Sequence, residues 1–193
     1  MYIRASHQPR DPADVVEVIR EHMFATLVTG MVASHLPFVL EGETLYAHMA
    51  RANPQSRMLD GEALVIFQGP HGYISPSWYE DRATAPTWDY VAVHCYGRPR
   101  VHDGDETRRN IERLIARVEA GRPNPWSLDD LSEDEIAELL RNVVSFEIPI
   151  ERTEGKFKLN QGDTEEHLRA AIAALEREGS GALAAYLRRF NGL

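Results

Sequence analysis

The stretch FATLVTGMVASHLPFVLEGETLYAHM, residues 24–49, decides the fold of this chain. It contains three short strand-like runs, FATLVTG, ASHLPFVL and ETLYAHM. The turn formers Gly30-Met31 and Glu41-Gly42-Glu43 separate these runs, and short apolar runs split in this way are typical of a β-meander. This part of the chain therefore predicts an antiparallel sheet.

More strands are predicted on the C-terminal side of the meander. ALVIFQG, residues 63–69, is expected to end at Gly69-Pro70, and YVAVHCYGRPRV, residues 90–101, is expected to end in a bulge or edge near Gly97 and Pro99. VVSFEIPIERTEG, from residue 143, returns to strand and leads into KFKLNQ. Strands in this number, without a regular alternation with helices, predict a β-barrel or a strongly curved sheet.

Four helical stretches surround these strands. They begin at the N-cap pair Asp11-Pro12, at Asp105, at the capping box that starts at Ser132, and at Asp163. The last one is expected at about 163–190 and is interrupted at Gly179-Ser180-Gly181. We therefore predict a mainly β fold with peripheral helices (α+β), in a single domain of residues 1–193.

The composition is that of a soluble globular protein, with 43% hydrophobic and 26% charged residues among 193. The apolar runs are too short to cross a bilayer, and the first residues lack the apolar core of a signal peptide, so we expect a cytoplasmic protein without a membrane partner. The net charge of −9 makes direct DNA binding doubtful.

Several kinds of chemistry are disfavoured. Cys95, the only cysteine, permits no internal disulfide, and its place in an apolar strand predicts an inert thiol. The eight histidines form no metal-binding pair on a predicted helix, so we expect no metal site. No glycine-rich phosphate loop and no nucleophile elbow occur in the sequence. A phosphate would therefore have to be held by side chains.

Three segments could hold such a ligand. HMARANPQSR, residues 48–57, groups an imidazole, guanidinium groups and amides, which suit an anion, although it also reads as a polar helix start on the surface. QGPHGYISPSWYEDRATAPTWDY, residues 68–90, is rich in rings that suit a flat ligand or a partner chain, or that could plug the end of a barrel. GKFKLNQ, residues 155–161, places Lys156 and Lys158 on one face of a strand, either for an anion or as a solvated edge.

Four segments together resemble the signature blocks of the PaiB-like FMN-binding negative transcriptional regulators. They are HMARANPQ, ALVIFQGPHGYISPSWY, PTWDYVAVHCYGRPR and FEIPIERTEGKFKLNQ. The resemblance covers most of residues 24–161 and implies a split β-barrel of the flavin-reductase kind. It also implies a homodimer with FMN at the subunit interface.

The resemblance further implies the cofactor-binding residues. His48, Arg51 and Asn53 belong to the phosphate and ribityl end. The flavin pocket or dimer contact would be lined by Gln68, Tyr73, Ser75, Trp78, Tyr79 and Trp88, and the cofactor approached by Lys156, Lys158 and Gln161. This chain departs from the family at Asp89, where Asn is frequent, and at Gly162-Asp163, and an acid is unfavourable beside an anionic cofactor.

Three functions follow from these observations. The first is an FMN-binding protein of the regulator type that acts indirectly, because no basic recognition helix is found. The second is a flavin-dependent oxidoreductase for a small substrate, with His71 or Tyr79 as its acid or base. The third is a haem-binding split barrel that uses one of the histidines as an axial ligand.

Overall fold

The fold is described from a computed structural model that covers residues 1–193. Its strands are β1 (Phe24–Thr29), β2 (Val32–Pro37), β3 (Val39–Glu41), β4 (Thr44–Ala50), β5 (Ala63–Ile74), β6 (Thr87–Gly97), β7 (Arg100–Val101) and β8 (Val143–Lys158). Its α-helices are α1 (Pro12–Glu21), α2 (Gly104–Glu119), α3 (Glu133–Arg141), α4 (Glu165–Arg177) and α5 (Gly181–Asn191). None of them is both long enough and apolar enough to span a bilayer.

The strands form a sheet in the order β2-β1-β5-β6-β8-β4-β3, with β7 paired to β8. Both turns predicted within residues 24–49 are present, because β1 pairs antiparallel with β2 and β3 pairs antiparallel with β4. The predicted run ASHLPFVL is divided into β2 and β3, which lie at opposite ends of the strand order, so this stretch forms two hairpins rather than one continuous meander. The mainly β class with helices is therefore confirmed. The chain divides into two compact units, one made of residues 1–18, 68–93 and 154–193, and the other of residues 19–67 and 94–153. The single domain stays a prediction.

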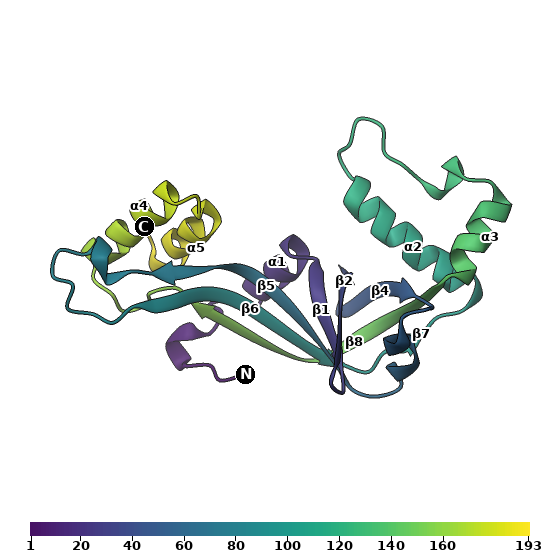
Figure 1. The fold of residues 1–193 in the computed structure, drawn as a ribbon, viewed down its shortest axis with the longest axis horizontal. Helices are drawn as coiled ribbons and strands as arrows, with labels where there is room; N and C mark the ends of the chain where they lie inside the picture. The colour runs from purple at the N-terminus through teal and green to yellow at the C-terminus, as the bar shows by residue number, and fades with distance from the viewer. The chain divides into compact units, whose positions relative to one another are not determined.

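The second unit, residues 19–67 and 94–153, is built around three aromatic rings. Phe38 makes edge contacts with Phe67 and Phe146, at centroid distances of 6.0 and 6.4 Å. Helix α2 is fixed to the strands by Asn110, whose amide donates to Ala47 O and Ser145 Oγ at 2.8 and 2.7 Å. Figure 1 shows α2 and α3 beside the end of the sheet that holds β4 and β7. A buried amide that donates to a strand carbonyl specifies where the helix packs.

The first unit, residues 1–18, 68–93 and 154–193, packs helices on one face of its strands. Phe157 of β8 stacks on Phe190 of α5 at 4.9 Å, and α4 and α5 lie side by side (Figure 1). A Cβ at Gly72 of β5 would lie only 2.9 Å from Leu183 Cδ2, so the helices sit directly on this glycine. Because successive side chains of a strand point to opposite faces, His71 and Tyr73 point away from the helices.

Two predicted element ends were wrong. Strand β5 does not end at Gly69-Pro70 but continues to Ile74. A Cβ at Gly69 would lie 3.0 Å from Val91 Cβ, so this glycine makes room for the neighbouring strand rather than a turn. The interruption predicted at Gly179-Ser180-Gly181 is present, because α4 ends at Arg177 and α5 begins at Gly181, but the N-cap of α4 is Thr164 rather than Asp163.

Replacing Gly97 by Ala tests the closeness of β6 and β8. A methyl group there would overlap the carbonyl oxygen of Pro149, which is backbone and cannot rotate away. We expect Gly97→Ala to lower the free energy of unfolding in urea by about 1–3 kcal/mol. Gly61→Ala is the matched control, because a Cβ added at Gly61 would have no neighbour within 4 Å, and it should be neutral or slightly stabilising. Equal stability of the two variants would contradict this packing.

Candidate functional site

Three rings of the first unit form an exposed cluster, which we call the aromatic platform: His71, Tyr73 and Trp88. Trp88 of β6 is 52% exposed and Tyr73 of β5 is 47% exposed. The Trp88 ring stacks on His71 at a centroid distance of 6.0 Å, and its Nε1 donates to His71 Nδ1 at 3.3 Å. The Tyr73 ring lies 6.3 Å from the Trp88 ring, centroid to centroid, and is tilted against it. The platform offers flat apolar area with polar edges, which suits a stacked ligand or a partner chain.

The segment after β5 is more structural than the sequence predicts. Ser75 caps the short 3-10 helix Pro76–Trp78, and its hydroxyl accepts from Ser77 N at 3.2 Å. Tyr79 is buried, stacks on His167 at 4.2 Å, and accepts a hydrogen bond from Asn160 Nδ2 at 3.3 Å. Trp78 is half-buried. Of the two interpretations of this aromatic segment, Tyr79 fits a core residue, while Tyr73 and Trp88 fit a binding surface.

A cavity of about 350 Å³ lies within the first unit. Its walls include three residues predicted to approach the cofactor, Tyr79, Lys158 and Gln161. Gln161 is partly committed to the chain, because its Oε1 accepts from Leu159 N and its Nε2 donates to Phe157 O. The structure therefore brings these three predicted residues together, on a different side of β5 and β6 from the platform.

Asp89 is the residue of this cavity whose role the sequence did not reveal. It is 0% exposed, and neither carboxylate oxygen has a donor at good hydrogen-bond geometry, although the Lys158 ammonium and the Asn160 backbone N–H act on it and lower its pKa. Lys158 Nζ stands 3.5 Å from Oδ1, but this ammonium donates to Thr87 Oγ1 and to Trp88 O instead. Burial raises the pKa of Asp89 to about 7, against the opposing effect of Lys158. The sequence feature that could have predicted this burial is an acidic residue inside a strand, between apolar neighbours.

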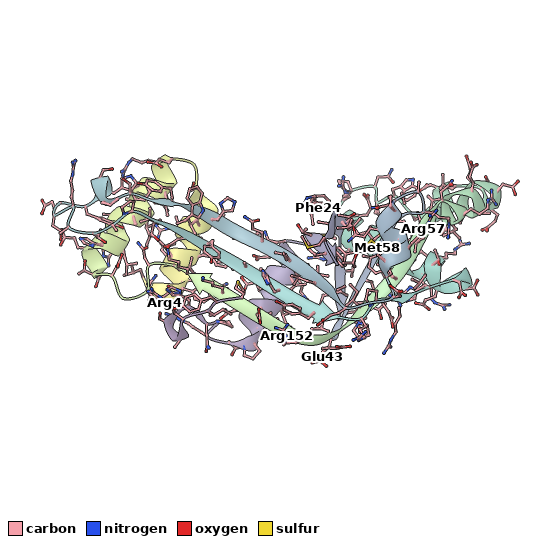
Figure 2. The ribbon with its side chains drawn as sticks, turned by 60° about the horizontal axis from the view of Figure 1, so that its bottom comes forward. Arg4, Phe24, Glu43, Arg57, Met58 and Arg152 are labelled. Carbon is pink, nitrogen blue, oxygen red and sulfur yellow. The ribbon has the colours of Figure 1, made fainter.

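The cavity is also lined by basic residues, Arg4, His7 and Lys158. His7 is buried with an unpartnered Nδ1, and its backbone N–H donates to Arg4 O at 2.9 Å. Arg4 also lines the cavity, and Figure 2 labels it on the N-terminal segment. Burial lowers the pKa of His7, and the charges of Lys156, Arg4 and Lys158 lower it further, so the ring is neutral. Lys156 itself makes no ion pair and lies over the rings of Tyr2 and Tyr90, at 5.7 and 5.1 Å.

The residues predicted to hold the phosphate and ribityl end of the cofactor, His48, Arg51 and Asn53, lie in the second unit. Arg51 Nε and Nη2 donate to the carbonyls of Arg141 and Val143, so its positive charge meets no carboxylate. Asn53 caps the short helix Pro54–Met58 and donates to Ser34 Oγ. Burial lowers the pKa of His48, which is therefore a neutral imidazole. Asn53 thus fits the alternative helix-start interpretation, and Arg51 keeps a charge available for an anion.

Gln68 completes the predicted set. It is exposed on β5, and the structure gives its side chain no hydrogen bond. The predicted residues thus fall into three groups, at the platform, at the cavity and in the second unit.

The chain was compared with known proteins. Residues 1–152 match a family model described as "Putative FMN-binding domain". The protease synthase and sporulation protein PAI 2 of Bacillus subtilis is 34% identical over 188 residues, which cover 92% of this chain and 90% of that protein.

Two solved structures share the fold. One is the FAD and heme binding protein of Mycobacterium smegmatis, with a TM-score of 0.63, 19% identity and coverage of 85% of this chain and 80% of that one. The other is the flavocytochrome Anf3 of Azotobacter vinelandii, with a TM-score of 0.62, 16% identity and coverage of 83% and 74%. These similarities confirm the split β-barrel fold class expected from the sequence.

Replacing Asp89 by Asn tests the burial of this carboxyl group. Its pKa is near 3.8 ordinarily and about 7 in the folded chain, so the unfolded chain loses the proton first as pH rises. Ionisation therefore destabilises the native state, and we expect Asp89→Asn to become progressively more stable than the parent between pH 4 and pH 7, then to keep a constant advantage. Urea unfolding across this range measures the difference.

The exposed Asp60 provides the control for removing one negative charge. Asp60→Asn should show a small difference from the parent without the same rise. A parent protein that gains stability over Asp89→Asn as pH rises would contradict the assignment.

Proposed function

The chain belongs to the FMN-binding domain family, and on that premise we propose that it is a homodimeric flavoprotein with FMN at the contact between its two copies. FMN is the cofactor that the family description names. Bound FMN would supply hydride and single-electron chemistry, while the protein supplies binding and orientation.

The aromatic platform is the observation that carries this proposal. An isoalloxazine ring is flat, with apolar faces and polar edges, and it fits a surface where Trp88 and Tyr73 are about half exposed. The helices of the first unit leave this face of β5 free, because they pack on Gly72. A monomer rarely keeps such rings in water, which supports a partner copy over this surface.

The phosphate end requires positive charge without a competing carboxylate. Arg51 and Lys156 meet this requirement, since Arg51 donates only to backbone carbonyls and Lys156 makes no ion pair. We assign the phosphate to Arg51, with His48 and Asn53 holding the chain around it, and either copy of a dimer could supply each residue. Gln68, Ser75, Trp78, Tyr79, Lys158 and Gln161 stay predicted contacts of the cofactor or of the dimer.

A regulatory role would be indirect. The net charge of −9 opposes a phosphate backbone, and the helices that begin with acidic first turns, α2, α3 and α4, offer no basic recognition surface. We expect no sequence-selective DNA binding by the FMN-loaded protein in a gel-shift assay. Tight and salt-sensitive binding to one promoter sequence would contradict indirect regulation.

Replacing Trp88 by Ala tests the platform. The parent protein should be yellow, run at dimer mass in solution and quench FMN fluorescence on titration. We expect Trp88→Ala to weaken FMN about tenfold, because the stacked ring is lost. Trp126→Ala removes another exposed tryptophan from the second unit and should leave the affinity unchanged. A colourless monomer that ignores added FMN would overturn the proposal.

The same titrations separate the two ends of the cofactor. Arg51→Gln should weaken FMN about tenfold, because charge-assisted hydrogen bonds to phosphate are lost, and should leave riboflavin unaffected. Trp88→Ala should weaken both ligands alike. Equal loss of FMN and riboflavin in Arg51→Gln would remove Arg51 from the phosphate site.

A further inference from the structure

A groove of about 830 Å³ lies within the second unit, between the end of α1, strand β3 and helix α2. Its volume is that of a typical ligand pocket. Neither the aromatic platform nor any residue predicted to bind the cofactor lines it. Flavin binding therefore gives this groove no role.

Part of the groove's lining is apolar. Met23, Leu40 and Ala116 line it and keep accessible surface, with the buried Phe38 and Val39 in the same lining. An apolar group that covers the accessible side chains removes apolar surface from water on both sides of the contact, which favours binding.

Both carboxylates that line the groove are paired with arginines. Glu41 Oε2 lies 3.1 Å from Arg113 Nε, and Glu112 Oε1 lies 3.0 Å from Arg108 Nε. These pairs compensate the negative charge of the lining.

Four arginines line the groove, and only two of them meet a carboxylate. Arg109 and Arg113 both bind Glu106, at 2.6 and 3.0 Å. The side chain of Arg20 makes no ion pair and no hydrogen bond, and that of Arg117 makes a single hydrogen bond, from Nη2 to Arg20 O at 2.9 Å. Arg20 and Arg117 therefore leave two positive charges without a carboxylate, in a protein whose net charge is −9.

We propose that this groove binds a small amphipathic anion, whose carboxylate or phosphate head pairs with Arg20 and Arg117. Its apolar body covers the accessible side chains of Met23, Leu40 and Ala116. The planar fork of a guanidinium donates parallel hydrogen bonds to either head group, and most N–H donors of Arg117 remain after its bond to Arg20 O. A neutral apolar molecule would leave both charges uncompensated, and a cation would be repelled by them.

This site goes beyond the proposed flavin function and shares no residue with it. FMN is also an anion with a ring system, so the two sites have to be separated by experiment. Arg117→Gln should leave the affinity for FMN unchanged, and Trp88→Ala should leave the binding of an amphipathic anion in the groove unchanged. Each proposal can therefore fail without the other.

The test uses the full chain, isotope-labelled for NMR, with hexanoate, hexyl phosphate, hexan-1-ol and inorganic phosphate as probes. We expect at least one of the two hexyl anions to shift amide signals around residues 20–23, 38–41 and 109–117 in a saturable way. It should bind about tenfold or more tightly than hexan-1-ol, which lacks the charge, and than inorganic phosphate, which lacks the apolar body. The tighter of the two anions identifies the head group.

Arg20→Gln and Arg117→Gln should each weaken that anion about tenfold, because charge-assisted hydrogen bonds are lost. The control is Arg177, an exposed arginine of α4 for which the structure gives no side-chain partner, and Arg177→Gln should leave the binding unchanged.

The proposal is overturned if neither hexyl anion produces saturable shifts, or if hexan-1-ol or inorganic phosphate binds as tightly. It is also overturned if neither Arg20→Gln nor Arg117→Gln weakens the binding. Added FMN should not displace the hexyl anion, and competition between the two would overturn a separate site and place the flavin in this groove.

Discussion

The two-residue period of β5 and β6 is the constraint on which the first unit depends. One face of these strands must accept α4 and α5, and it does so at Gly72, where there is no side chain to hold the helices away. The opposite face then has no protein to cover it, and there His71, Tyr73 and Trp88 gather. Moving by a single residue, from Trp88 to Asp89, exchanges an exposed ring for a buried carboxylate. Platform and cavity are thus two consequences of one backbone geometry.

Local signals in the sequence predicted much of the fold. The turn formers at Gly30 and Gly42 predicted the turns of two hairpins, and both glycines adopt the left-handed conformation that such turns require. The capping box at Ser132 predicted the start of α3, and both of its reciprocal hydrogen bonds form. The C-terminal end of β5 was missed because Gly69 reads as a turn former locally, whereas its role depends on Val91 of another strand. Spacing along one chain does not reveal such a neighbour.

The sequence indicated which residues belong to the candidate site, but it did not reveal that they fall into three separate groups, at the platform, at the cavity and in the second unit. The alternation of lysines and apolar residues in GKFKLNQ gave the correct faces, since Phe157 and Leu159 are buried while Lys156 and Lys158 are not. The resemblance to a family grouped Tyr73 with Tyr79, although the structure exposes one and buries the other. In the sequence Asp89 stood out as an acid that is unfavourable beside an anionic cofactor. The structure turns it inward beside Lys158, so burial rather than a ligand anion governs its ionisation.

The burial of Cys95 has a consequence for how copies of this chain can associate. Its thiol is 0% exposed, and burial raises its pKa to about 12, so almost no thiolate exists at neutral pH. Because it is the only cysteine, no disulfide can join two folded copies. Whatever holds a pair of chains together must be packing, hydrogen bonds and shared ligands. The strength of that association is consequently independent of the thiol redox state of its surroundings.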